Sequence, residues 1–171
     1  MQRRLLAAVA AFLIAAVGAV VLVSYARSAD ARARAGEQLV PVLLGKALSA
    51  GWRVELRAGD AQRLERLDLH LWQAEGFLPH GMAGGPHDAR QPVLLTLASQ
   101  QAANDPACLM ALDGVAVTPD EMARLDRACI IFDGGDDTAT ARARDQWREL
   151  TGAGIEAQYW SEESGRWERK R

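Results

Sequence analysis

The fold class is decided by residues 118–160, which read TPDEMARLDRACIIFDGGDDTATARARDQWRELTGAGIEAQYW. This stretch opens with a strong helix-start signal. Thr118 can cap the helix, Pro119 takes the first helical position, and Glu121 closes a capping box with Thr118. The apolar run ACIIF at residues 128–132 follows and indicates a buried strand.

The same stretch then repeats the change from helix to strand. A long helix is expected to begin at Asp136 or Asp137 and to end at Gly152, and residues 155–160 are expected to form the next strand. Helices and strands that alternate in this way are typical of a doubly wound α/β fold with a largely parallel sheet.

The chain before Thr118 continues this alternation. Asp60 can cap a helix in which the leucines at positions 64, 67 and 71 share one buried face. The expected elements are a helix over residues 42–50, a strand over 52–57, a helix over 61–73, and strands over 91–98 and 108–112.

Length and composition limit the class of protein. The 171 residues, 49% hydrophobic and 25% charged with a net charge of −2, are enough for one ordinary domain. Residues 38–171 carry 15 basic against 20 acidic side chains. This part therefore lacks the excess of basic residues by which proteins bind nucleic acids nonspecifically. Cys108 and Cys129 each lie inside an apolar run, which predicts buried free thiols.

The N-terminal segment admits three interpretations. Residues 5–23 are 19 uninterrupted apolar residues, long enough to cross a membrane as a helix, and a membrane anchor is the leading interpretation. A cleaved signal peptide is the second, and a buried first strand over residues 19–25 is the third. On the leading interpretation residues 28–37 are a polar linker. The chain then divides into an anchor with its linker, 1–37, and an α/β domain, 38–171.

In composition the first 44 residues resemble the membrane-anchoring start of CpaB/RcpC-type pilus-assembly proteins. This resemblance implies a membrane-anchored pilus-assembly or envelope protein that contacts the membrane through residues 5–23. The pattern after Leu44 does not continue it.

No motif in the chain indicates a reaction. The glycine-rich run at residues 81–86, GMAGGP, lacks the spacing and the lysine of a phosphate-binding loop. The run DGGDD at residues 133–137 follows a strand end, where Mg²⁺ sites occur, but acidic residues at a helix start are more often caps. His70, His80 and His87 lack the further ligands of a metal site. We therefore expect no catalytic residue, no cofactor and no metal.

Seven motifs follow one another along residues 39–171: LLGKALSAGWRV, LDLHLW, FLPHGMAGGPHDARQPVLL, ACLMALDG, RACIIFDGGD, ARDQWRELTGAGIEAQYW and SEESGRWERK. Together, and in this order, they give this part of the chain a close resemblance to the chi subunit family of bacterial DNA polymerase III. The resemblance implies a Rossmann-like α/β fold that catalyses nothing itself. It also implies a cytoplasmic replisome subunit that links the clamp loader to the single-stranded-DNA-binding protein, SSB, and reaches single-stranded DNA only through SSB.

The resemblance also implies a binding site for the acidic C-terminal tail of SSB. A peptide that ends in acidic residues, an apolar side chain and a carboxylate needs a hydrophobic pocket rimmed by arginine. By the family motifs Trp72 is expected to form a wall of this pocket and Arg144 to bind the carboxylate, with Arg142 and Arg148 as neighbours.

A second site is expected at residues 77–81, FLPHG. Two large apolar residues beside a proline in a loop are hard to place in a helix or strand core, which indicates an exposed docking surface. This segment resembles the family's contact surface for the psi subunit of the clamp loader, so Phe77, Leu78 and Pro79 are candidates for that interface.

The chain departs from the family pattern at its start. The family usually begins with a strand, and here the apolar segment takes that place. Either residues 20–25 supply the strand, or the sheet lacks an edge and the protein is a fusion of an anchor with a chi domain.

Overall fold

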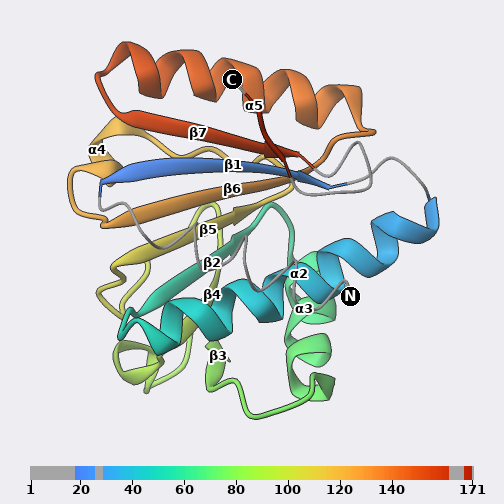
Figure 1. The fold of residues 1–171 in the computed structure, drawn as a ribbon. Coiled ribbons are helices and arrows are strands. Elements are labelled where there is room, and N and C mark those ends of the chain that lie inside the picture. Colours follow the sequence, from blue (N-terminus) through green and yellow to red (C-terminus); the bar gives the residue numbers. More distant parts are fainter. Residues whose placement is uncertain (1–17, 26–28, 162–167, 171) are drawn as a thin grey trace.

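An eight-stranded sheet forms the centre of the molecule (Figure 1). The computed structural model describes residues 18–25, 29–161 and 168–170. The strands are β1 (Ala19–Tyr25), β2 (Val54–Ala58), β3 (His80–Met82), β4 (Val93–Leu97), β5 (Cys108–Leu112), β6 (Arg127–Asp133), β7 (Glu156–Ser161) and β8 (Glu168–Lys170). The helices are α2 (Ala29–Ser49), α3 (Ala61–Gln73), α4 (Pro119–Met122) and α5 (Asp137–Gly152), with a short 3-10 turn at Asp88–Arg90.

The strands lie in the order β3-β4-β2-β5-β6-β1-β7-β8. Neighbouring strands are parallel except for β7 and β8, which are antiparallel. Parallel neighbours need crossover connections, and helices supply several of them on the two faces of the sheet. The prediction of an α/β fold with a largely parallel sheet is therefore confirmed.

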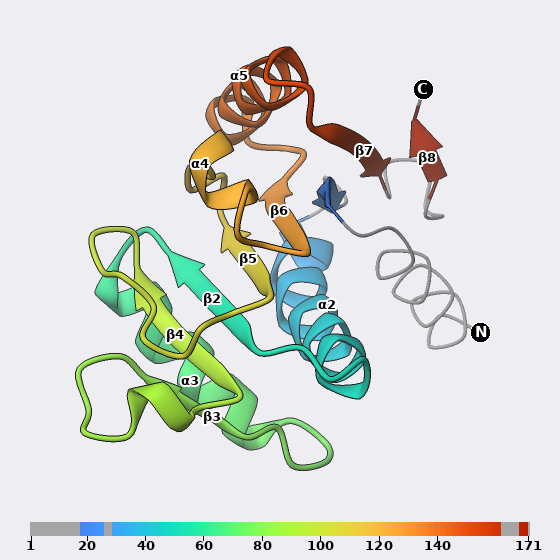
Figure 2. The same cartoon turned by 90° about the vertical axis from the view of Figure 1, so that its left-hand side faces the viewer.

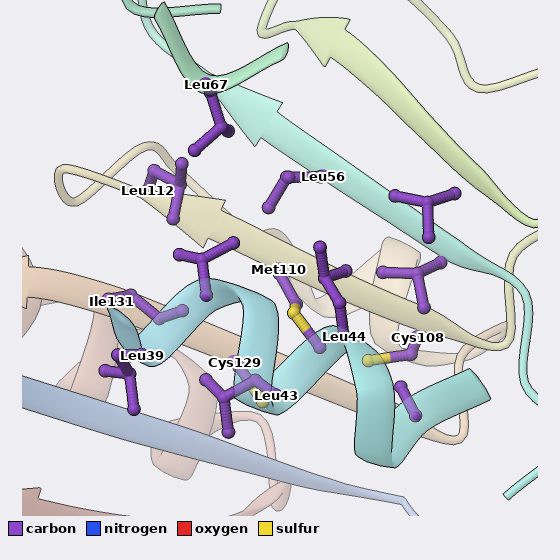
Figure 3. Close-up of a cluster of buried hydrophobic side chains, with 14 of the residues drawn as sticks. Leu39, Leu43, Leu44, Leu56, Leu67, Cys108, Met110, Leu112, Cys129 and Ile131 are labelled. Atoms are coloured by element: carbon purple, nitrogen blue, oxygen red, sulfur yellow. The ribbon is translucent and has the colours of Figure 1, made fainter. Parts of the chain in front are cut away.

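Each face of the sheet carries its own apolar core. On one face Leu43 and Leu44 of α2 pack with alternate strand residues such as Met110 (Figure 3). On the other face Ala143 and Leu150 of α5 pack against the remaining strand residues. Figure 2 shows α2 and α4 on opposite sides of β5 and β6. Because both faces are covered here, the central strands are apolar at successive positions rather than alternating.

Strand β1 lies inside the sheet, between β6 and β7, and pairs with both in parallel register. Its side chains enter both cores, Val21 and Val23 on the α2 face and Val20 and Leu22 on the α5 face. The membrane-helix prediction is therefore wrong for residues 19–23, because their backbone groups are paired with two neighbouring strands. The third interpretation, a buried first strand, is confirmed, and the strand is central rather than at an edge.

The rest of the predicted membrane span, residues 5–17, lies outside the described residues. Within the described ranges, no helix is long and apolar enough to cross a membrane.

Helix α2 is longer than the sequence pattern indicated. The stretch predicted as a polar linker, residues 28–37, is helical from Ala29, and α2 runs across the boundary predicted between residues 37 and 38. The helix includes Pro41, a residue that usually ends helices because it lacks a backbone donor. Leu39 and Leu43, on either side of this proline, are buried against the sheet, which holds the helix in place.

Local start signals formed as expected. The Asp60 carboxylate accepts a hydrogen bond from the Arg63 backbone N–H at 2.8 Å and caps α3. Thr118 and Glu121 form the predicted capping box at α4. The cysteines, Cys108 and Cys129, are buried and free, also as predicted.

Two short edge strands were not predicted. Strand β3 falls inside a region expected to be a loop and pairs with β4, and β8 pairs with β7 near the C-terminus. Each has only three residues, too few to show a strand period in the sequence.

Candidate functional site

A pocket of about 380 Å³ lies beneath α5 at the β7–β8 side of the sheet. Its walls come from β1, β6, β7, β8 and α5. The lining residues are Leu22, Phe132, Thr140, Ala143, Arg144, Trp147, Tyr159 and Lys170. We call this the α5 pocket.

Helix periodicity and sheet register bring these residues together. The α5 residues Thr140, Ala143, Arg144 and Trp147 follow the i, i+3, i+4, i+7 spacing of one helix face. Below them, residues of β1, β6 and β7 lie side by side, because β1 pairs with both other strands. The pocket therefore depends on β1 occupying the centre of the sheet.

The floor of the α5 pocket is aromatic and fixed in orientation. The rings of Phe132 and Tyr159 stack with centroids 6.3 Å apart and an interplanar angle of 13°. The Tyr159 hydroxyl forms a hydrogen bond of 2.9 Å with the Ser24 hydroxyl on β1. Trp147 packs against the same core from α5. This surface suits an apolar side chain of a ligand.

Among the described residues, two charged side chains line the α5 pocket, Arg144 and Lys170, and both are cationic. Arg144 is an exposed residue of α5, and Lys170 reaches the pocket from β8. The Thr140 hydroxyl also lines it, is shielded from solvent and has no hydrogen-bond partner within the described part of the chain. Apolar walls with two cations suit a ligand that combines an apolar group with a carboxylate.

The other two arginines predicted for this site lie outside the α5 pocket. Arg148 is highly exposed and forms an ion pair of 3.1 Å with Asp145, one turn before it on α5. Arg142 is on α5 and lies beside Gly114, which belongs to the loop between β5 and α4. Arg142 falls on the side of α5 turned away from Thr140 and Trp147, whereas Arg148 lies one turn beyond Arg144 and outside the pocket lining.

Trp72 also lies away from Arg144. It is on α3, which covers the opposite face of the sheet, and 61% of its surface is exposed. Its ring centroid is 4.9 Å from that of His80 and 6.5 Å from that of Phe77. The structure therefore does not bring Trp72 and Arg144 into one pocket, and the tryptophan that lies with Arg144 is Trp147.

A second candidate surface surrounds Trp72. Phe77 is 76% exposed, and Leu69, Trp72 and Met82 are also exposed. Large apolar side chains that gather at a protein surface often mark a binding site. Trp72 and Phe77 lie close together, and Leu69 is one turn before Trp72 on α3; we call these three residues the α3 surface.

The segment that presents Phe77 is held by His80. This histidine is buried, and its Nδ1 lies 2.6 Å from the carbonyl oxygen of Leu78. Its Nε2 lies 3.4 Å from a carboxylate oxygen of Asp68 on α3. Leu78 and Pro79 are half-buried, so of the three predicted psi contacts Phe77 is the one fully presented to solvent.

A second cavity, of about 510 Å³, lies over β2 and the loop between β4 and β5, and three of the charged residues that line it, Glu55, Arg57 and Glu121, are paired with one another. The Arg57 guanidinium donates to Glu55 at 2.9 Å and to Glu121 at 2.6 Å. The Thr96 hydroxyl donates to Glu55 at 2.7 Å. We call Glu55, Arg57, Thr96 and Glu121 the Arg57 network.

The pairing shifts two pKa values within the Arg57 network. Burial lowers the pKa of Arg57, but hydrogen bonds to Glu121 and Glu55 outweigh burial and hold it above its usual value. Burial raises the pKa of Glu121, but hydrogen bonds from Arg57 and Thr118 outweigh burial and hold it below its usual value. Both groups are therefore more firmly charged than they would be in the unfolded chain.

The glycine-rich and acidic runs serve local structure. The backbone N–H groups of Gly84 and Gly85 donate to the Asp88 carboxylate at 2.7 and 3.0 Å. The Asp136 carboxylate accepts hydrogen bonds from the first turn of α5, which confirms its interpretation as a cap. Among the described residues no group of three or more metal-ligating side chains gathers.

The fold and the α5 pocket define an α/β protein with a largely parallel sheet and a pocket that has apolar walls and two cations. The sequence model of the family described as DNA polymerase III chi subunit, HolC, matches residues 21–158. The chain belongs to this family of accessory DNA polymerase III subunits and is thereby a replication protein. A comparison of the sequence with curated proteins finds no match.

The family match begins inside β1 and ends inside β7. The apolar run that resembles a pilus-assembly anchor therefore contributes part of the chi domain. Strand β8, which carries Lys170, lies beyond the match.

Proposed function

We propose that this chain is the chi subunit that links the clamp loader of DNA polymerase III to SSB, in the cytoplasmic replisome. The observation that carries this proposal is the α5 pocket. It combines an aromatic floor with two cations on a chi-family fold. The acidic C-terminal tail of SSB offers the complementary groups, an apolar side chain and a carboxylate.

The tail would bind by two kinds of contact. Its apolar side chain enters the α5 pocket and packs on Phe132, Trp147 and Tyr159, which removes apolar surface from water. Its carboxylate pairs with the Arg144 guanidinium, whose planar donors match a carboxylate. The rigid Phe132–Tyr159 stack lowers the ordering cost of binding, because little must move when the tail arrives. Single-stranded DNA is then reached through SSB.

The α3 surface is the proposed contact for the psi subunit. Phe77 supplies the most exposed aromatic ring, with Trp72 beside it and with Leu78 and Pro79 in the same segment. Aromatic residues that can bury a large area are typical anchors of protein interfaces. Trp72 is thus assigned to the psi side rather than to the SSB side.

A titration of the full chain with a fluorescent peptide that copies the SSB tail tests the proposal. Saturable binding is expected, and Arg144→Gln should weaken it about tenfold, because a charge-assisted contact is lost. Arg148→Gln removes the same charge one turn away, outside the α5 pocket, and should change affinity by less than about twofold. Added salt should weaken binding by the unchanged chain.

Trp72→Ser completes the test, since it removes an aromatic ring of the α3 surface and should leave peptide binding unchanged. The absence of saturable binding to the folded full chain would contradict the proposal. Equal losses in Arg144→Gln and Arg148→Gln would also contradict it, because they would indicate attraction by net charge alone.

A further inference from the structure

We propose that Lys170, carried by the C-terminal strand β8, is a second cation that binds the terminal carboxylate of the peptide. This inference rests on the proposed SSB-tail function of the α5 pocket and assigns part of that function to a strand outside the chi-family match. On this proposal β8 is a working part of the binding site as well as an edge of the sheet.

The register of β8 places Lys170 over the floor of the α5 pocket. Strands β7 and β8 are antiparallel, and Lys170 is paired with Tyr159 in this ladder. Side chains of directly opposed residues point to the same face of a sheet. Lys170 therefore stands beside the Tyr159 ring, on the face covered by α5 (Figure 2 shows β8 alongside β7).

The neighbouring cation of β8 points elsewhere. Arg169 is paired with Trp160, and successive residues of a strand face opposite sides of the sheet. Trp160 packs against the α2 face, whereas Tyr159 packs against the α5 face. Of these two adjacent basic residues, Lys170 alone lines the α5 pocket.

The charge of Lys170 is available to a ligand. Its ammonium group lies 3.5 Å from the Glu168 carboxylate, and both side chains are more than one third exposed. Exposed pairs of this kind are weak and exchange readily. A peptide carboxylate held by Arg144 would offer Lys170 a partner that is already fixed in place.

The test uses the full chain and the fluorescent SSB-tail peptide in two forms, one with a free C-terminal carboxylate and one with a C-terminal amide. Lys170→Gln should weaken binding of the free-acid peptide roughly threefold to tenfold. The same substitution should change binding of the amide peptide by less than about twofold. Glu168→Gln should strengthen binding of the free acid, because it removes the carboxylate that competes for Lys170.

Arg169→Gln is the matched control, since it removes the same charge one residue away on the opposite face of β8. Equal losses in Lys170→Gln and Arg169→Gln, or an equal loss for both peptide forms, would overturn the assignment of Lys170. Arg144→Gln separates this inference from the function on which it rests. If Arg144→Gln weakens peptide binding and Lys170→Gln does not, the proposed function of the α5 pocket is supported and the proposed role of Lys170 is wrong. If the unchanged chain does not bind the peptide, the proposed function itself fails.

Discussion

The buried charge of Arg57 is held by several partners. Arg57 is only 8% exposed, yet its guanidinium contacts Glu55, Glu121 and the backbone carbonyl of Ala116. Removing one partner from such a group leaves a buried charge poorly paired, which is costly. The Arg57 network therefore makes the stability of the protein depend on the ionisation of Glu121.

Glu121→Gln should lower the free energy of unfolding at pH 7 by about 1 to 2 kcal/mol. The pKa of Glu121 is lower in the folded than in the unfolded chain, so its stabilisation is fully present above its usual value of 4.5. It is lost as the pH falls through the folded-state pKa. Urea unfolding from pH 7 downward should show a smaller loss of stability in Glu121→Gln than in the unchanged chain.

Asp120→Asn is the control for this measurement, because Asp120 is an exposed carboxylate next to Glu121 in the chain. It should retain the pH dependence of the unchanged chain. An identical acid sensitivity in Glu121→Gln would contradict the role given to the Arg57 network.

Single residues of the pocket were predictable only in part. Arg144 follows from the family motif, and its exposed position on a helix is local information. Trp147 lies three residues further on the same helix face, so helical spacing could have joined it to Arg144. Lys170 and Leu22 reach the pocket from opposite ends of the chain. Only the pairing of β1, β7 and β8 reveals that they are neighbours.

At the scale of elements, local signals predicted well and non-local ones did not. The caps at Asp60 and Thr118 act within four residues, so the sequence alone identifies them. Whether residues 19–25 form a helix or a strand depends instead on partners more than a hundred residues away in β6 and β7. A continuous apolar run fits a central parallel strand as well as a membrane helix, so periodicity could not separate the two.

A chain that starts at Gly36 should fail to fold cooperatively. This shortened chain lacks β1. The loss of β1 leaves β6 and β7 without their common neighbour and exposes both apolar cores. Circular dichroism and urea unfolding of this shortened chain, beside the full chain, would measure the effect. A cooperative transition of similar midpoint in both would show that β1 is dispensable.

At the scale of the whole molecule, the two candidate sites lie at opposite edges of the sheet. The α3 surface adjoins β3 and β4 at one edge, and the α5 pocket adjoins β7 and β8 at the other. With strands about 4.8 Å apart, these edges are separated by roughly 30 Å. The sites are also on opposite faces, so one ligand on each would not collide.

Simultaneous binding is therefore expected. With the psi subunit immobilised, the full chain should capture the fluorescent SSB-tail peptide, and the two ligands should not compete. Phe77→Ser should abolish capture by weakening attachment to psi, while peptide binding in solution stays unchanged. Arg144→Gln should still attach to psi, but it should capture less peptide and bind it more weakly in solution. Displacement of the peptide from the chain in solution by added psi would show that the two sites overlap.

The position of β1 also bears on how the polypeptide folds during translation. Strand β1 precedes every other described element, but its first partner to be made, β6, emerges from the ribosome about a hundred residues later, and β7 later still. At 5 to 20 residues per second, the apolar strand waits roughly 5 to 20 s before it can be covered. During that interval residues 19–23 are an exposed hydrophobic segment next to a longer apolar run, which is the kind of segment that chaperones and targeting factors bind. The nascent chain can therefore be bound at this segment before it folds, whereas in the folded protein the same residues are buried inside the sheet.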